Sequence, residues 1–267
     1  MLKRNIFTII SLCIVVALFL VGKYTEKKNQ KEEEPVKQQI EIVPAEIKEN
    51  VPMGKFSGKI ICIDPGHGNT SRKETEPIYP GANEKKATNV SGTSGKIMTE
   101  EALNLEVGLK LKSAFEKEGA TVYITREAHE SDMSNVERAE FANNLNCDMV
   151  VRLHADGSES KSVSGVSILI PSAKRISEGY LTGEVIEKSR KAGEYILSDV
   201  CAMTGAPNKG IIERPDMTGF NWSGVPVVLL EMGFMTNPEE EAKLVTDEYQ
   251  QKIISGILSG LEKYFNE

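Results

Sequence analysis

The sequence predicts an α/β domain whose mostly parallel or mixed twisted sheet carries helices on both faces. From residue 59 onward, short apolar runs alternate with amphipathic stretches, the order typical of strands that alternate with helices. Several of these apolar runs have the composition of strands buried on both faces. The chain has 267 residues and no internal repeat, so we expect a single domain with appendages.

Each expected element follows from a local pattern. The run 59–63 is apolar and ends at Asp64, Pro65 and Gly66, as a buried strand does before a turn. Over 100–118, apolar residues recur at steps of three or four, which predicts a helix that Gly119 ends. The same criteria predict strands at 121–125, 148–153, 165–170 and 225–230, and helices at 135–145 and 178–203, with one or two helices over 238–265.

Residues 1–22 are expected to form a signal-anchor or transmembrane segment. Lys3 and Arg4 precede an apolar run over 6–21, whose length lies between that of a signal-peptide core and a membrane-spanning helix. Because no small-x-small cleavage site follows, we expect an uncleaved anchor; a cleaved signal peptide and a buried core helix are the alternatives. Both export interpretations place the remainder of the chain outside the cytoplasm.

Residues 23–56 are expected to be a disordered charged linker. The segment is rich in Lys, Glu, Gln and Pro, and its opposite charges balance. Such a composition cannot bury enough apolar surface to fold alone. The linker would separate the membrane segment from a domain at 57–267, which we expect to be catalytic.

Charge and cysteine content exclude some classes of protein. The net charge of −7 argues against a nucleic-acid partner, because phosphate binding needs a basic surface. The sequence has no C-x-x-C pair among its four cysteines, which are Cys13, Cys62, Cys147 and Cys201. They therefore indicate neither a disulfide framework nor a thiolate zinc site.

Three chemically capable residues follow expected strands. They are His67, His154 and Glu231. In open α/β sheets ligands gather at the carboxyl ends of the strands, so these side chains should meet in one crevice. His129 lies in a polar stretch, and we expect it to be exposed.

Two neutral imidazoles and one carboxylate, with a position left for water, form a hydrolytic zinc site. Glu100, in the first turn of the helix at 100–118, is the candidate third ligand beside His67 and His154. Zn²⁺ lowers the pKa of bound water to about 7 and polarises a carbonyl. Glu231 would then take the proton of the water and pass it to a leaving amine.

Plainer interpretations of the same residues stay open. A histidine after a strand is often a hydrogen-bonded loop residue, and Glu100 suits the positive end of a helix without binding anything. Glu231 would also serve as a helix cap. Arg214 is either a salt-bridged surface residue or a clamp for a substrate carboxylate.

Four segments resemble, in order, the catalytic domain of the zinc-dependent N-acetylmuramoyl-L-alanine amidases, the amidase type 3 family. The resemblance covers 59–265 and rests on residues 63–68, 100–105, 153–156 and 231–238. It implies that His67, Glu100 and His154 bind Zn²⁺ and that Glu231 is the catalytic carboxylate. It further implies a peptidoglycan hydrolase that cuts the amide bond between N-acetylmuramic acid and the L-alanine of the stem peptide.

Some residues depart from the family pattern. Arg152 stands where the family usually has a small residue, Glu101 stands where Lys is common, and 69–98 is longer than usual. We expect 69–98 to be a loop at the rim of the site. The alternatives are a zinc peptidase or deacetylase acting on another cell-wall amide, or a catalytically silent wall-binding module.

The resemblance also sets the expected partners and location. They are peptidoglycan and, through the N-terminal segment, the membrane. We expect a monomer that is extracytoplasmic, either anchored in the cell membrane or secreted to the cell wall.

Overall fold

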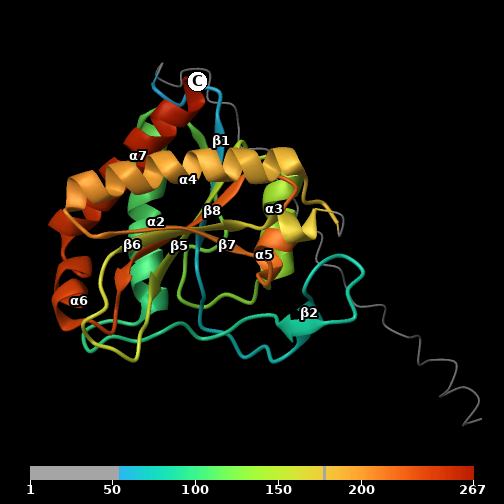
Figure 1. Cartoon of the computed structure of the whole chain (residues 1–267), viewed down its shortest axis with the longest axis horizontal. Coiled ribbons are helices and arrows are strands. Elements are labelled where there is room, and N and C mark those ends of the chain that lie inside the picture. Colours follow the sequence, from blue (N-terminus) through green and yellow to red (C-terminus); the bar gives the residue numbers. More distant parts are fainter. Residues whose placement is uncertain (1–53, 177–178) are drawn as a thin grey trace, which may run out of the picture. The chain divides into compact units, whose positions relative to one another are not determined.

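A computed structural model describes residues 54–176 and 179–267 (Figure 1). The expected membrane segment at 1–22 and the linker up to residue 53 lie outside the described residues. Residues 54–56, expected to end the linker, instead belong to the domain, because Phe56 is fully buried against Phe115. Within the described part, no helix combines the length and apolar character needed to cross a membrane.

A six-stranded sheet with the order β4-β1-β5-β8-β6-β7 forms the centre of the domain (Figure 1). Its strands are β1 (Ile60–Pro65), β4 (Thr121–Ile124), β5 (Met149–Asp156), β6 (Val166–Pro171), β7 (Asn208–Arg214) and β8 (Val227–Phe234). Neighbouring strands run parallel except for β6 and β8, which are antiparallel. The predicted mostly parallel or mixed sheet is therefore confirmed.

Helices cover both faces of the sheet, as predicted. They are α2 (Glu100–Lys117), α3 (Asn135–Asn144), α4 (Gly183–Thr204), α5 (Thr218–Asn221), α6 (Pro238–Leu244) and α7 (Asp247–Phe265), with a 3₁₀ turn at Ala173–Arg175. The larger core lies under α2, α4 and α7. A second core lies under α3 and α5, on the opposite face.

Alternation along the strands assigns side chains to these two faces. On β5, Met149, Val151 and Leu153 belong to the larger core, whereas Val150 belongs to the second. Arg152 and His154 follow Val150 at two-residue steps and therefore share the face that α3 and α5 cover. This placement brings polar side chains together at the carboxyl edge of the sheet.

Several element boundaries differ from the predictions. The helix expected from residue 178 begins only at Gly183, where the Thr182 hydroxyl accepts from the Val185 N–H and caps it. The strand β7 was not predicted. The expected rim loop 69–98 contains a short hairpin, β2 (Thr75–Pro77) with β3 (Lys85–Ala87).

Candidate functional site

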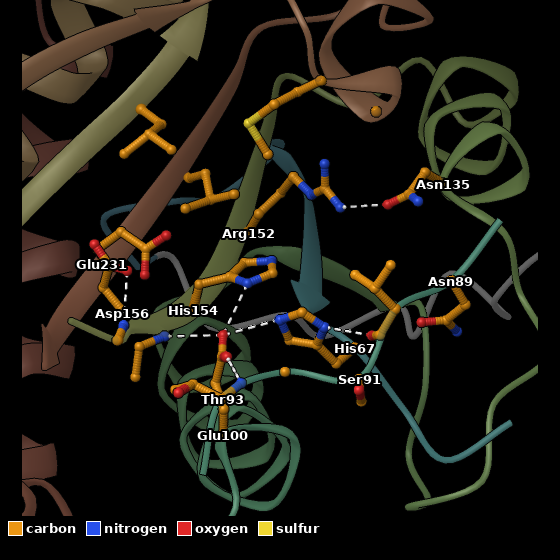
Figure 2. Close-up of a pocket in the computed structure, with 18 of the residues that line it drawn as sticks. His67, Asn89, Ser91, Thr93, Glu100, Asn135, Arg152, His154, Asp156 and Glu231 are labelled. Atoms are coloured by element: carbon orange, nitrogen blue, oxygen red, sulfur yellow. Dashed lines mark hydrogen bonds and ion pairs between the residues drawn. The ribbon is translucent and has the colours of Figure 1, made fainter. Parts of the chain in front are cut away.

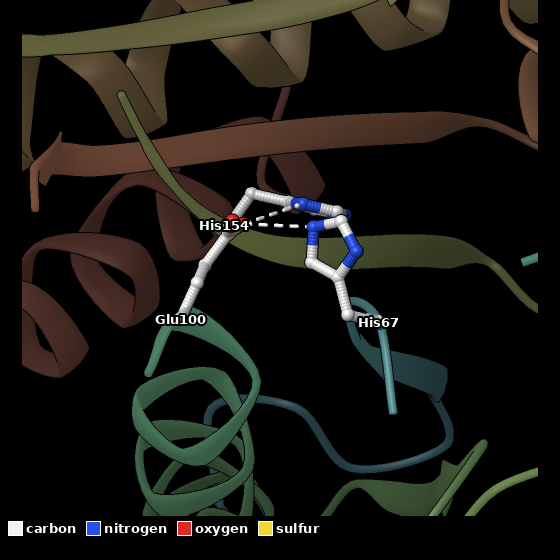
Figure 3. Close-up of side chains that lie close together, drawn as sticks. All are labelled: His67, Glu100 and His154. Atoms are coloured by element: carbon white, nitrogen blue, oxygen red, sulfur yellow. Dashed lines mark hydrogen bonds and ion pairs between the residues drawn. The ribbon is translucent and has the colours of Figure 1, made fainter. Parts of the chain in front are cut away.

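His67, Glu100 and His154 come together from three separate elements (Figure 3). His67 follows β1, Glu100 is the first residue of α2, and His154 belongs to β5. The His67 Nε2 and His154 Nδ1 atoms each lie 3.0 Å from Oε1 of Glu100. One ligand atom from each of the three residues lies within 4.8 Å of the other two. The three side chains therefore form the predicted cluster of candidate metal ligands.

The expected positions relative to the strands need one correction. Only His67 lies beyond the end of its strand. His154 and Glu231 lie inside β5 and β8, directly opposite each other in the parallel register. Both strands extend beyond their predicted ends, β5 through His154 to Asp156 and β8 through Glu231 to Phe234.

The His67 ring is oriented by a backbone carbonyl. Its Nδ1 lies 2.8 Å from the carbonyl oxygen of Val90, which can only accept, so Nδ1 carries a proton and donates it. With Nδ1 used in this way, only Nε2 is left to bind a metal ion, and it faces the carboxylate of Glu100. Two acceptors 3.0 Å apart repel each other unless a proton or a cation lies between them. The donor set of this structure therefore suits a cation.

Glu100 is fixed by donors from three directions. Its Oε2 accepts from the Thr93 N–H at 2.8 Å, and its Oε1 accepts from the Ala155 N–H at 3.2 Å and the Asn104 amide at 3.4 Å. Burial alone would raise the pKa of Glu100, but the His154 and His67 rings beside the carboxylate outweigh it and lower the pKa. The carboxylate is therefore ionised, as a metal ligand must be.

His154 is held as a neutral ring. Burial is the main cause that lowers its pKa to about 4, and the hydrogen bond to Glu100 offsets only part of this effect. Gly66 packs directly on the ring, because a Cβ at this position would lie 2.2 Å from His154 Nε2. Only glycine allows this close approach of the β1 end to the ring.

Two buried arginines hold the backbone that carries His67. Arg126 donates to the carbonyls of Pro65 and Gly66 at 2.9 and 3.0 Å. Arg138 donates to the carbonyl of His67 at 2.7 Å. These bonds maintain His67 at φ 63°, a backbone conformation that costs energy for a residue with a side chain.

Glu231 faces the same cleft in different surroundings (Figure 2). Its Oε2 is buried and has no hydrogen-bond partner within 54–176 and 179–267. Burial, together with the negative charges of Glu100 and Asp156, raises the pKa of Glu231 well above its usual value, and Arg214 opposes this only in part. The carboxyl group is therefore suited to gaining and losing a proton beside the ligand cluster.

A cleft of about 850 Å³ contains these groups. Residues 86–93 line one side of it, and Arg214, Asp216 and the start of α5 line another. Arg214 forms the salt bridge that one interpretation expected, because its Nε and Nη2 donate to Asp216 at 2.8 and 2.9 Å, and its side chain lines the cleft. His129 is exposed, as expected, and contacts Glu101.

Sequence reasoning missed the groups that support the ligands. The Val90 carbonyl and the Thr93 N–H belong to the 69–98 segment, and any residue type supplies such backbone groups, so no sequence signal marks them. Asp64 and Arg138 carried a weak signal, because a charged residue at a strand end or on the apolar face of a helix needs a partner.

The family model of N-acetylmuramoyl-L-alanine amidase matches residues 61–263. The chain is 28% identical over 215 residues to N-acetylmuramoyl-L-alanine amidase Rv3717 of Mycobacterium tuberculosis, which covers 77% of this chain and 86% of the relative. It is 24% identical to the germination-specific N-acetylmuramoyl-L-alanine amidase of Bacillus subtilis, with 79% of this chain and 82% of that protein covered.

A solved structure shows the same fold. The crystal structure of the N-acetylmuramyl-L-alanine amidase Ami1 from Mycobacterium smegmatis superposes with a TM-score of 0.71 at 25% identity. The match covers 79% of this chain and 98% of Ami1.

Proposed function

Because the chain belongs to the amidase type 3 family of N-acetylmuramoyl-L-alanine amidases, we propose that it uses Zn²⁺ held by His67, Glu100 and His154. Family membership makes the chain a peptidoglycan hydrolase that cuts the bond between N-acetylmuramic acid and L-alanine. The observation that carries the metal proposal is the approach of two ring nitrogens to the same Glu100 oxygen, each at 3.0 Å.

The side chains of the cleft would divide the work of hydrolysis. Zn²⁺ in this ligand set would supply a Lewis acid that activates water and polarises the scissile carbonyl. The Val90 carbonyl keeps His67 in the tautomer with a free Nε2. Glu231 accepts the proton of the attacking water on its unpartnered oxygen and delivers it to the L-alanine nitrogen as the C–N bond breaks.

We propose that Arg214 contacts the substrate at the rim of the cleft. Asp216 already occupies Nε and Nη2, so a two-pronged clamp on a substrate carboxylate would require Asp216 to be released. The group left for substrate is Nη1. The side chain is 40% exposed, which screens its charge and limits its contribution to binding.

The location follows from the N-terminal segment and the substrate. We propose that residues 1–22 anchor the chain in the membrane, that 23–53 form a spacer, and that the domain from residue 54 onward, which includes the buried Phe56, acts outside the cytoplasm as a monomer. Fractionation of cells and N-terminal sequencing of the exported protein test the anchor. Recovery of a soluble chain beginning beyond residue 22 would contradict it.

Mass spectrometry of muropeptide digests tests the reaction. Purified 54–267, which keeps the buried Phe56, should release stem peptides that begin with a free L-alanine amine, and a zinc chelator should stop the release, with added Zn²⁺ restoring it. Products cut at another amide would indicate the peptidase or deacetylase alternative. Binding to the wall without any product would indicate the silent module.

A further inference from the structure

A buried charge cluster lies under the cleft, beside the ligands. Asp64, at the end of β1, sits between two arginines (Figure 2 shows Arg152). Arg138 Nη1 approaches Oδ1 of Asp64 at 2.6 Å, and Arg152 Nε approaches Oδ2 at 2.7 Å. All three residues are at least 94% buried. Two cations share one anion, so the cluster keeps an excess positive charge in a place where charge is costly to leave unpaired.

The two arginines differ in how fully they are bound. Every nitrogen of the Arg138 guanidinium donates to an oxygen of the protein. Arg152 donates through Nε to Asp64 and through Nη2 to Asn135 at 3.3 Å. Its Nη1 has no partner in the described part of the chain. Arg214 offers a contrast, because it has Asp216 as a carboxylate of its own.

Arg152 belongs to the same cleft as the ligands. It lines the cleft together with Asn135, Thr218 and Gly219. Gly219 leaves room for the guanidinium, because a Cβ at that position would lie 2.2 Å from Nη1. Arg152 and His154 are two residues apart on β5 and on the same face, a step of about 6.6–6.8 Å along a strand.

We propose that Arg152 binds the free α-carboxylate of the second residue of the stem peptide, a γ-linked glutamate; this inference rests on the proposed function. That carboxylate is the first anionic group beyond the scissile amide on the leaving-peptide side. An extended chain spans at most about 3.3–3.6 Å per residue, so it lies about 7 Å from the scissile carbonyl. Arg152 lies one two-residue step from His154 on the same face of β5, and both side chains line the same cleft. A carboxylate here would also balance the excess charge of the cluster.

The experiment compares two synthetic muropeptides that differ only at this group, one with the free α-carboxylate and one with its carboxamide. The wild-type domain should favour the carboxylate by about 10- to 100-fold in kcat/KM, the usual effect of a hydrogen bond to a charged group, mainly through KM. Arg152→Met should remove the preference by lowering kcat/KM for the carboxylate substrate only. Arg152→Lys should retain part of it.

Controls separate this role from a structural one. Arg152→Met removes a buried partner of Asp64 and should lower Tm, so the test is the ratio of carboxylate to carboxamide rates, measured on folded, zinc-loaded protein. Arg190→Met is the matched control, because Arg190 is 41% exposed and pairs with Glu213 outside the ligand cluster. Equal wild-type rates on both muropeptides would overturn the inference. So would equal losses on both substrates in zinc-loaded Arg152→Met.

Peptide binding distinguishes this inference from the proposed function. Calorimetric titration of zinc-loaded Glu231→Gln protein uses stem peptides that carry the carboxylate or the carboxamide. A preference for the carboxylate without cleavage by the wild type would support the Arg152 site and contradict the amidase reaction. Cleavage by the wild type without any preference for the carboxylate would support the amidase reaction and contradict the Arg152 site.

Discussion

The two glutamates of the cleft lie in opposite surroundings, although both face the same space. Glu100 accepts hydrogen bonds from backbone N–H groups and an amide and has two ring nitrogens beside it, and its pKa is lowered. Glu231 keeps a buried oxygen without a partner in the described structure, and its pKa is raised. One carboxylate is fixed in its ionised form, and the other needs a nearby positive charge before it ionises.

The difference shows that the environment assigns roles to two chemically identical groups. A ligand should hold one geometry and one charge, which the donors around Glu100 provide. A proton carrier should change its charge during the reaction, and a dense set of donors would prevent this. Exchanging the surroundings would therefore exchange the roles. Four predictions test this contrast, starting with the largest effect.

Removing a ligand should abolish both metal binding and activity. His154→Ala leaves two protein ligands in place of three, and Glu100→Gln removes the negative charge of the carboxylate ligand. In both variants we expect bound zinc to fall from about one per chain to near zero. Metal analysis after dialysis and the muropeptide assay measure this. Full activity in metal-free protein would contradict the mechanism.

Replacing the proton carrier should separate binding from chemistry. Glu231→Gln should keep near-normal zinc content and folding while activity falls roughly 10²–10⁴-fold, the usual effect of general acid–base catalysis. Glu239→Gln, on the exposed side of α6, is the matched control. If Glu231→Gln instead loses the metal while Glu100→Gln keeps it, the two roles assigned here are exchanged.

Weakening the support of Glu100 should have a smaller effect. Asn104→Leu removes the amide that lies 3.4 Å from Oε1 of Glu100 but keeps the side-chain volume. We expect zinc affinity to fall about 10- to 100-fold, as is usual for groups that orient a ligand. Competition with a chromogenic chelator measures it, with Asn144→Leu on the exposed end of α3 as control. Unchanged affinity would show that the backbone donors suffice.

The smallest effect is expected at the rim. Arg214→Met removes a half-exposed side chain that already has Asp216 as its partner, so KM should rise less than about tenfold while kcat stays constant. Steady-state kinetics on a soluble muropeptide measures both constants. A large fall in kcat would place Arg214 at the reacting atoms, contrary to its contact with Asp216.

Local patterns identified most of the fold and the candidate ligands, because apolar runs mark buried strands and polar residues stand out at their ends. The strand β7, which was not predicted, shows what local sequence patterns cannot detect. It lies at the edge of the sheet with exposed charged residues, and only Ile211 and Ile212 form an apolar pair. Its position depends on pairing with β6, which sequence periodicity does not report.

In the site too, contacts between residues far apart in the sequence could not be predicted from local patterns. Arg152 stood out as unusual, but its partner Asp64 lies 88 residues away in the sequence. The opposite surroundings of Glu100 and Glu231 depend on backbone groups and on burial, and neither is encoded in residue type. The sequence therefore predicted the identity of the candidate ligands, whereas the protonation of the two glutamates required the structure.

The bonds from Arg126 and Arg138 to the backbone around His67 affect how folding depends on metal binding. They fix the ligand-bearing turn through groups of the chain itself, without contribution from an ion. We therefore expect the turn to form before a metal ion binds. Metal should then raise Tm only by the mass-action amount that its concentration and Kd dictate, which thermal unfolding with and without chelator measures.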